Sequence, residues 1–132
     1  MKAISAKPTL TLCQKTILVA ADNYGGKELG LITVLKYKGR KRGHPVAGIA
    51  SLIVVVIKKG KPEVRKKVEH AVIIRTRKEY RRASGIRIKF EDNAAVIVDD
   101  KGVPKGSEIK GVVAREVGER WPKVSGIAPM VI

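Results

Sequence analysis

The sequence predicts an all-β protein, a small barrel followed by a short helical region near the C-terminus. Three observations support this prediction. Short apolar runs recur along the chain, and turn-forming residues, chiefly Gly, Asn, Asp and Pro, separate them. Residues 86–90 alternate apolar with basic side chains, as a strand does when only one of its faces lies in a core. After residue 112 the period changes to four, because Val113, Val117 and Trp121 fall on one face of a helix.

Six strands are expected, and each follows from its local composition. They cover residues 15–21, 28–38, 50–57, 71–74, 86–90 and 94–98. The first two form a hairpin across residues 22–26, where Asp and Asn bond their own backbone and Gly accepts a positive φ. Residues 50–57 are apolar without alternation, which is typical of a strand covered on both faces. Residues 71–74 and 86–90 are expected to form a second hairpin with a cationic tip and with Ile86 in the core.

A chain of 132 residues is expected to form one domain. Its expected parts are a flexible N-terminal arm at residues 1–14, a β-barrel at residues 15–111, and a helical region at residues 112–132 packed on the barrel. Pro8 disfavours a helix in the arm. Gly118 weakens the C-terminal helix, and Pro122 is expected to end or restart it. The apolar residues 125–132 are expected to pack on the barrel or to bind a partner.

The charge of the chain is strongly positive and unevenly distributed. The formal net charge is +16, and residues 36–89 hold 18 of the 28 Lys and Arg but only 3 of the 12 Asp and Glu. So large a charge repels itself in a compact fold and is typical of proteins that bind a polyanion. No apolar run approaches the roughly 18 residues that span a membrane, so nucleic acid is the favoured partner. RNA is preferred to DNA, because the basic residues lie on strands and loops and no recognition helix is evident.

The sequence carries no signature of catalysis or of a metal site. It contains no GxxxxGK[ST] loop, no GxGxxG, no HExxH and no GxSxG. His44 and His70 lie far apart, and the single Cys13 is expected to be a small buried residue. Glu91 and Asp92 are adjacent and point to opposite faces of a strand, so a salt bridge is favoured over an acidic dyad. We therefore expect no enzyme activity, no catalytic residue, no metal and no cofactor.

The predicted RNA-binding site consists of four basic clusters, which several loops of a barrel could bring together into one cationic face. Arg binds phosphate oxygens through two parallel hydrogen bonds, whereas Lys supplies a point charge. Tyr37 and Tyr80 lie in basic runs, where each either stacks on an unpaired base or packs its ring on the barrel. The predicted contacts are Arg40, Lys41, Arg42, Lys58, Lys59, Lys61, Arg65, Lys66, Lys67, Arg75, Arg77, Lys78, Tyr80, Arg81 and Arg82.

The stretch from residue 71 to residue 97 carries a family resemblance. Its apolar quartet is followed after nine residues by Ser84 and Gly85, and then at fixed intervals by Phe90, Asn93 and the pair Val96 and Ile97. This spacing resembles the signature of the large-subunit ribosomal protein L14 family. Residues 58–68 and 90–95, with Trp121 and Pro122, are similar to the archaeal and eukaryotic branch of that family. Ala50 and Ser51 depart from it, because Gly-Asp is usual there.

The resemblance implies a closed five-stranded barrel and a structural, non-enzymatic role in the large ribosomal subunit, in the cytoplasm. It implies that the basic clusters bind large-subunit rRNA, and that the protein contributes to the intersubunit interface and to translation-factor docking. The implied partners are neighbouring large-subunit proteins, the small subunit and the anti-association initiation factor six, with no membrane partner. The candidate interface residues are Arg115, Arg120, Trp121, Ile127 and Met130.

Two alternatives stay open. A standalone RNA-binding or chaperone module outside the ribosome would carry the same charge and the same strands. An RNA-processing enzyme is the runner-up from a different class, and it would use Glu91 or His70 as a catalytic group.

Overall fold

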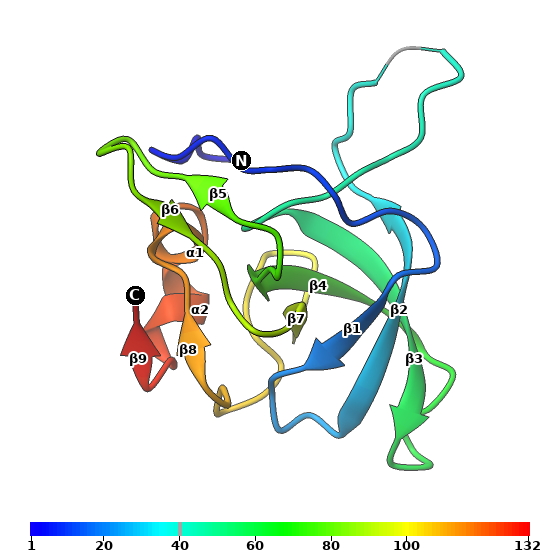
Figure 1. Ribbon diagram of the computed structural model, residues 1–132. Helices are drawn as coiled ribbons and strands as arrows, with labels where there is room; N and C mark the ends of the chain where they lie inside the picture. The colour runs from blue at the N-terminus through cyan, green and yellow to red at the C-terminus, as the bar shows by residue number, and fades with distance from the viewer. Residues whose placement is uncertain (40) are drawn as a thin grey trace.

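The computed structural model describes residues 1–39 and 41–132, and within them five strands form a closed barrel (Figure 1). These strands are β1 (Ile17–Ala20), β2 (Gly26–Val34), β3 (Leu52–Gly60), β4 (Val68–Arg75) and β7 (Ala94–Val98). Neighbouring strands are antiparallel except at the closure, where β1 pairs in parallel with β7. The predicted mainly-β class and the five-stranded barrel are confirmed.

Aliphatic side chains fill the barrel. β1 shows the strand period most clearly, since Leu18 and Ala20 are buried while Ile17 and Val19 are exposed. β7 is buried along its whole length, because the chain after it folds back and Lys105 donates its backbone N–H to the Ile97 carbonyl. The expected two-sided cover of residues 50–57 is wrong, because Val54 and Val56 of β3 are only partly buried.

A second, smaller sheet lies outside the barrel. It consists of β5 (Tyr80–Arg81) and β6 (Arg87–Ile88), which we call the β5–β6 hairpin. The predicted pairing of residues 71–74 with 86–90 is wrong, because β4 pairs with β3 and β7. Ile86 is 61% exposed rather than in the core. Alternation over five residues identifies a strand but does not say which sheet the strand joins.

The C-terminal region packs against the outside of the barrel beside β4, where the Ala114 N–H donates to the Ile74 carbonyl. It contains β8 (Val112–Val113), α1 (Arg115–Arg120), α2 (Pro122–Gly126) and β9 (Met130–Val131), and β8 pairs in parallel with β9. The predicted break at Pro122 is confirmed, since α1 ends at Arg120 and Pro122 begins α2. The helix begins later than its period suggested, because Val112 and Val113 are in β8. Neither helix of the described residues has the length and apolar character needed to cross a bilayer.

Residues 1–14 run along the barrel and the β5–β6 hairpin (Figure 1). Isolated bridges join Lys7 to Arg81 and Leu12 to Ala47, and Leu12 is buried. Ser5 donates its backbone N–H and its hydroxyl to the Glu119 carboxylate on α1, at 2.8 and 2.6 Å. The arm therefore has defined docking contacts, and its expected flexibility stays a prediction.

Candidate nucleic-acid interface

The basic clusters lie at two opposite ends of the barrel. The start of β3 pairs with the ends of β2 and β4, so the loop that follows β2 and the β5–β6 hairpin share one end (Figure 1). The turn from β3 into β4 lies at the other end, where Lys61 donates its N–H to the Gly25 carbonyl. β3 has nine residues, so the two ends are about 25 Å apart. We call them the hairpin end and the turn end. The four clusters do not converge into one face.

The turn end presents its cations at the end of β3 and on the following loop, which is held by backbone hydrogen bonds. Val64 is buried and anchors the loop, and Lys66 donates its N–H back to the Ile57 carbonyl at 2.8 Å. Gly60 is required, because its φ is +157° and a Cβ there would lie 2.4 Å from the Gly25 carbonyl oxygen. Lys59 forms a 2.8 Å ion pair with Glu28. The exposed cations here are Lys58, Lys59, Lys61, Arg65, Lys66 and Lys67.

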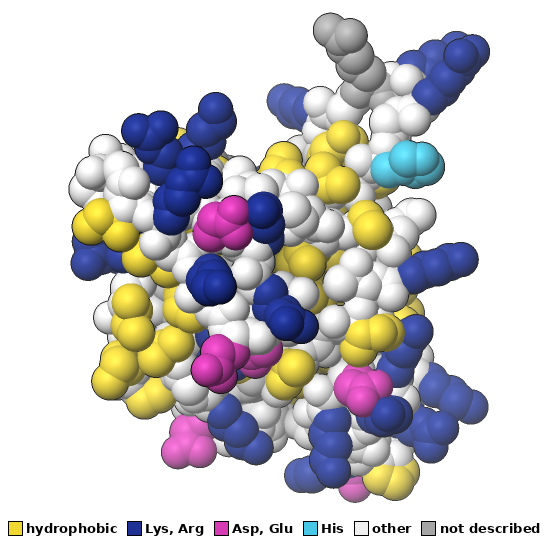
Figure 2. Space-filling model, viewed as in Figure 1, with side chains coloured by type: hydrophobic (Ala, Val, Ile, Leu, Met, Phe, Trp, Pro, Cys, Tyr) yellow, Lys and Arg dark blue, Asp and Glu magenta, His cyan; other side chains and the backbone are white. Residues whose placement is uncertain are grey.

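The hairpin end carries a second group of exposed cations. In Figure 2, Lys and Arg side chains gather over the β5–β6 hairpin at the upper left and, separately, over the turn end at the lower right. Lys78 bonds to Glu79 at 2.8 Å and holds the pKa of that carboxyl below its ordinary value. Arg40 lies outside the described residues. The exposed predicted contacts at this end are Lys41, Arg42, Arg77, Lys78 and Arg81.

Arg75 is turned into the protein. It is 8% exposed, and its guanidinium donates to both Asp92 carboxylate oxygens at 2.8 and 3.2 Å. The same group donates to the backbone carbonyls of Lys110 and Val112 at 3.0 and 2.8 Å. Gly111 makes room for it, since a Cβ there would lie 2.7 Å from the Arg75 Nη1 atom. Arg75 therefore joins the barrel to the C-terminal region, and we leave it out of the RNA contacts.

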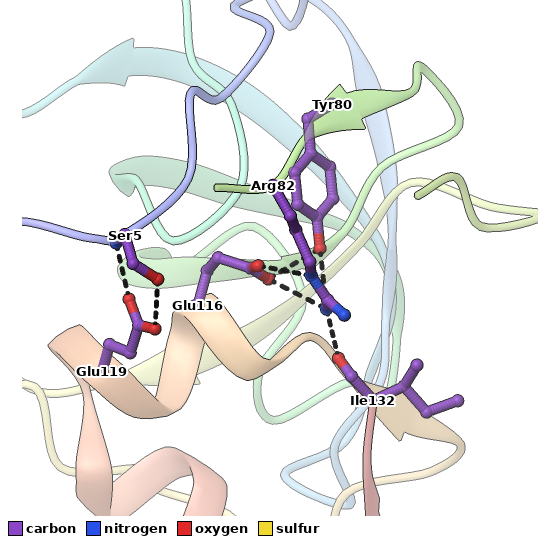
Figure 3. A network of polar contacts seen from close by, with 6 residues as sticks. All are labelled: Ser5, Tyr80, Arg82, Glu116, Glu119 and Ile132. Atoms are coloured by element: carbon purple, nitrogen blue, oxygen red, sulfur yellow. Dashed lines mark hydrogen bonds and ion pairs between the residues drawn. The ribbon is translucent and has the colours of Figure 1, made fainter. Parts of the chain in front are cut away.

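Tyr80 and Arg82 are also engaged internally, through the buried Glu116 (Figure 3). The Tyr80 hydroxyl and the Arg82 Nε–H each donate to the Glu116 carboxylate at 2.7 Å. Arg82 Nη2 also donates to the Ile132 carbonyl at 2.6 Å. Burial, together with the Glu116 carboxylate, raises the pKa of Tyr80 far above its ordinary value. This network fixes the β5–β6 hairpin to α1 and to Ile132, which follows β9, so the buried Tyr80 ring is not free to stack on a base and the Arg82 guanidinium is held in place internally.

The five candidate interface residues also divide into residues with internal contacts and residues that are exposed. Trp121 donates its indole N–H to the Ala50 carbonyl at 2.9 Å, and Arg120 donates to that carbonyl and to the Lys2 carbonyl. Ile127 is partly buried against the core. Arg115 and Met130 are exposed, and Met130 lies beside the exposed Val131 and Ile132. Among the described residues, no side-chain hydrogen bond or ion pair engages Arg115 or Met130, so these two of the five are exposed to a partner.

The structure places one further aromatic residue beside exposed cations, which the sequence did not indicate. The partly buried Phe90 lines an open hollow of about 1000 Å³, together with Arg77, Lys89 and Gly111. The sequence indicates Phe90 as a marker of the family spacing. Its position beside two exposed cations could be found only once the chain was folded.

The groups considered for catalysis do not form a reactive cluster. Asp92 is bonded to Arg75, Glu91 is exposed, and His70 pairs with Asp100 at 2.8 Å. Cys13 is exposed rather than buried. Within residues 1–39 and 41–132, no three His, Cys, Asp or Glu side chains are grouped to hold a metal ion.

Comparison with known proteins identifies the family of the chain. The family model described as ribosomal protein L14p/L23e matches residues 11–132. Curated relatives named large ribosomal subunit protein uL14 include that of Methanothrix thermoacetophila, which is 52% identical over the full length of both chains. Those of Methanocella arvoryzae and Halobacterium salinarum are 50% and 48% identical, again over the full length of both chains. The chain therefore belongs to the ribosomal protein L14p/L23e family.

Proposed function

We propose that this protein is a structural constituent of the large ribosomal subunit that binds large-subunit rRNA through the exposed cations of its two ends. One observation carries the proposal: eleven of the predicted contacts are exposed. Within the described residues, Lys59 and Lys78 are the only two of these eleven that form an ion pair. A surface of this kind is stabilised by phosphate. Because the chain belongs to a ribosomal protein family, we expect the polyanion to be rRNA. The expected location is the ribosomes of the cytoplasm.

The electrostatic part of this proposal is tested by salt dependence. RNA affinity should fall with salt by about 0.7 to 0.9 log units per log unit of salt for each phosphate contact. Replacing Lys58, Lys61 and Lys67 together with Gln should lower the slope by about 2 to 3. The matched control replaces three exposed cations outside the predicted set, Lys2, Lys110 and Lys123, with Gln. Equal slopes for the two triple variants would contradict a specific role for the turn end.

The ribosomal part is tested by assembly. The protein should sediment with large subunits and stay bound through high-salt washes, because it is held by many contacts within a folded ribonucleoprotein. A standalone RNA-binding or chaperone module would be washed off. The turn-end triple variant should incorporate less well than the control triple.

We also propose that the exposed C-terminal group contributes to factor docking and to the intersubunit interface, including contact with the anti-association initiation factor six. Arg115 and the apolar edge at Met130 support this, because they are exposed and no described residue covers them. Arg115→Ala combined with Met130→Ser should weaken factor binding to large subunits and leave rRNA affinity unchanged. Lys123→Ala, an exposed change on α2, is the control. Unchanged factor binding in the double variant would refute this part.

A further inference from the structure

Three exposed cations lie side by side at the hairpin end, on the two strands of the β5–β6 hairpin and on the N-terminal arm beside them. Arg81 of β5 stands opposite Arg87 of β6, and on its other side opposite Lys7 of the N-terminal arm. The arm is joined to β5 at this point, since the Lys7 N–H donates to the Arg81 carbonyl at 3.0 Å. Residues directly opposite in antiparallel strands point to the same face, and adjacent strands are about 4.8 Å apart. The three positive side chains therefore share one face within about 10 Å.

The described residues do little to neutralise this row. Like charges placed directly opposite destabilise a pair of strands. Glu79 is near enough for Arg87 to act on its carboxyl, but Lys78 already holds that carboxylate at 2.8 Å. The two other acidic groups nearby are also taken, since Glu116 is bonded to Arg82 and Glu119 to Ser5. The backbone bond from Lys7 to Arg81 thus holds the arm against β5, while the positive side chains of the row repel one another without a neutralising carboxylate.

The space between the arm and the hairpin suits small anionic groups. A hollow of about 390 Å³ lies there, and its lining includes Lys7, Arg81 and Arg82. The inner side of this hollow is fixed, because Arg82 is held by Glu116 and the Ile132 carbonyl. Arg and Lys side chains on its rim can donate to several phosphate oxygens at once.

We propose that Lys7, Arg81 and Arg87 form a row that binds successive RNA phosphates, and that these phosphates couple the N-terminal arm to the β5–β6 hairpin. The inference deepens the proposed rRNA-binding function and rests on it. Without an anion, repulsion between the side chains opposes docking of the arm. With phosphate in place the same charges favour docking, and by linkage a docked arm raises RNA affinity by the same factor.

The coupling is measured by hydrogen exchange at the Lys7 amide, whose N–H is bonded to Arg81 only when the arm is docked. The probes are a short RNA duplex and, separately, inorganic tripolyphosphate. In the full-length protein at low salt, saturating RNA should slow exchange of this amide by about threefold or more. Tripolyphosphate should act in the same direction if phosphate itself is what the row recognises. No effect of tripolyphosphate alongside an effect of RNA would overturn that assignment.

The variant Arg87→Gln should change exchange of the Lys7 amide in opposite directions without RNA and with RNA. It removes one charge of the row without removing the backbone bond between Lys7 and Arg81. Without RNA its Lys7 amide should exchange more slowly than in the wild type, because repulsion is reduced. With RNA the additional slowing should be smaller than in the wild type, and the salt slope of RNA binding should fall by about 0.7 to 0.9.

Lys101→Gln is the matched control, since it removes one exposed charge in the turn after β7, next to the start of β4 at the turn end. It should leave exchange at Lys7 as in the wild type, with and without RNA. The inference is overturned if RNA binds and exchange at Lys7 does not change, or if Arg87→Gln behaves like Lys101→Gln; the proposed function survives both results. Failure of the protein to bind RNA at all would instead overturn the proposed function.

Discussion

The barrel and the layer outside it are held together by different interactions. In the barrel, ladder hydrogen bonds and fully buried aliphatic side chains such as Leu18, Ile53 and Ile73 provide the stability. The outer layer, which consists of residues 1–14, the β5–β6 hairpin and residues 112–132, also buries apolar groups such as Val117 and Val124. It is fixed in position by a few polar anchors: Arg75, Glu116 and the Ala50 carbonyl. A barrel strand can therefore lose one contact among many, whereas the outer layer depends on single groups.

The largest effect is expected for Glu116→Ala. The change leaves the Arg82 guanidinium and the Tyr80 hydroxyl without their buried acceptor, and breaking a buried pair in this way costs about 3 to 5 kcal/mol of unfolding free energy. Urea denaturation measures the loss. Hydrogen exchange should show faster opening of α1, β5 and β9 than of β3 and β4. Glu119→Ala, which removes only the contact with Ser5, is the control; an equal loss there would mean that burial of the anchor is unimportant.

A barrel substitution should have a slightly smaller effect that is spread over the whole molecule. Ile73 is a fully buried residue of β4, which pairs with β3 and β7. Ile73→Ala should lower the free energy of unfolding by about 3 kcal/mol. Protection from exchange should fall together in all barrel strands, because they share one core. Val19→Ala, at an exposed position of β1, should change stability little. Local opening confined to β4 in the Ile73 variant would contradict the distinction between the two regions.

Asp22 is a polar anchor within the barrel itself. Its carboxylate accepts the backbone N–H of Ile97 at 2.7 Å, and both residues are buried. Asp22→Ala would leave that N–H without a partner, which costs about 1 to 3 kcal/mol. Thermal or urea unfolding measures the change. A loss well below that of Ile73→Ala would support the view that apolar packing dominates this part of the fold.

Ala50 should respond only weakly to replacement by Gly. Its φ is +61°, a conformation that costs a residue with a Cβ about 1 to 2 kcal/mol. Its buried methyl group contributes roughly 0.8 kcal/mol in return, so Ala50→Gly should change the unfolding free energy by less than about 1 kcal/mol. Ala50→Val should be clearly destabilising by comparison, because a β-branched side chain fits this φ poorly. Equal stability of the two variants would show that backbone strain at residue 50 is relieved elsewhere.

The smallest effect concerns acidification of the arm. Two hydrogen bonds from Ser5 hold the pKa of the Glu119 carboxyl below its ordinary value of 4.5. The contact therefore adds stability above pH 4.5, and this is lost as the pH falls through the lower pKa of the folded state. Protection of the Ser5 amide, measured relative to its intrinsic exchange rate at each pH, should fall in that range, before the barrel unfolds. Glu119→Gln should remove this pH dependence of protection, and a dependence of protection that persists would assign it to another group.

The difference between the barrel and the outer layer also explains which features could be predicted from the sequence. The five barrel strands follow from apolar runs and turn residues, and the break at Pro122 follows from the chemistry of proline. Arg75 and Arg82 could not be distinguished from Arg77 and Arg81, since all four lie in one basic stretch. Their difference depends on Asp92 and Glu116, which fold against them from 17 and 34 residues away. Charge count indicates a cationic surface, but pairing partners decide which cations remain on it.

The parallel pairing of β1 with β7 has a consequence for how the chain folds. Val19 meets Ala94 across a separation of about 75 residues, so this contact carries the largest loop-closure cost in the barrel. The β1–β2 and β3–β4 hairpins are local and can form early, whereas closure must wait for β7. Until then β1 and β4 are unpaired edge strands, and exposed edges promote association with other chains. A chain that ends before residue 94 would keep these two edges open and should aggregate, even with both hairpins intact.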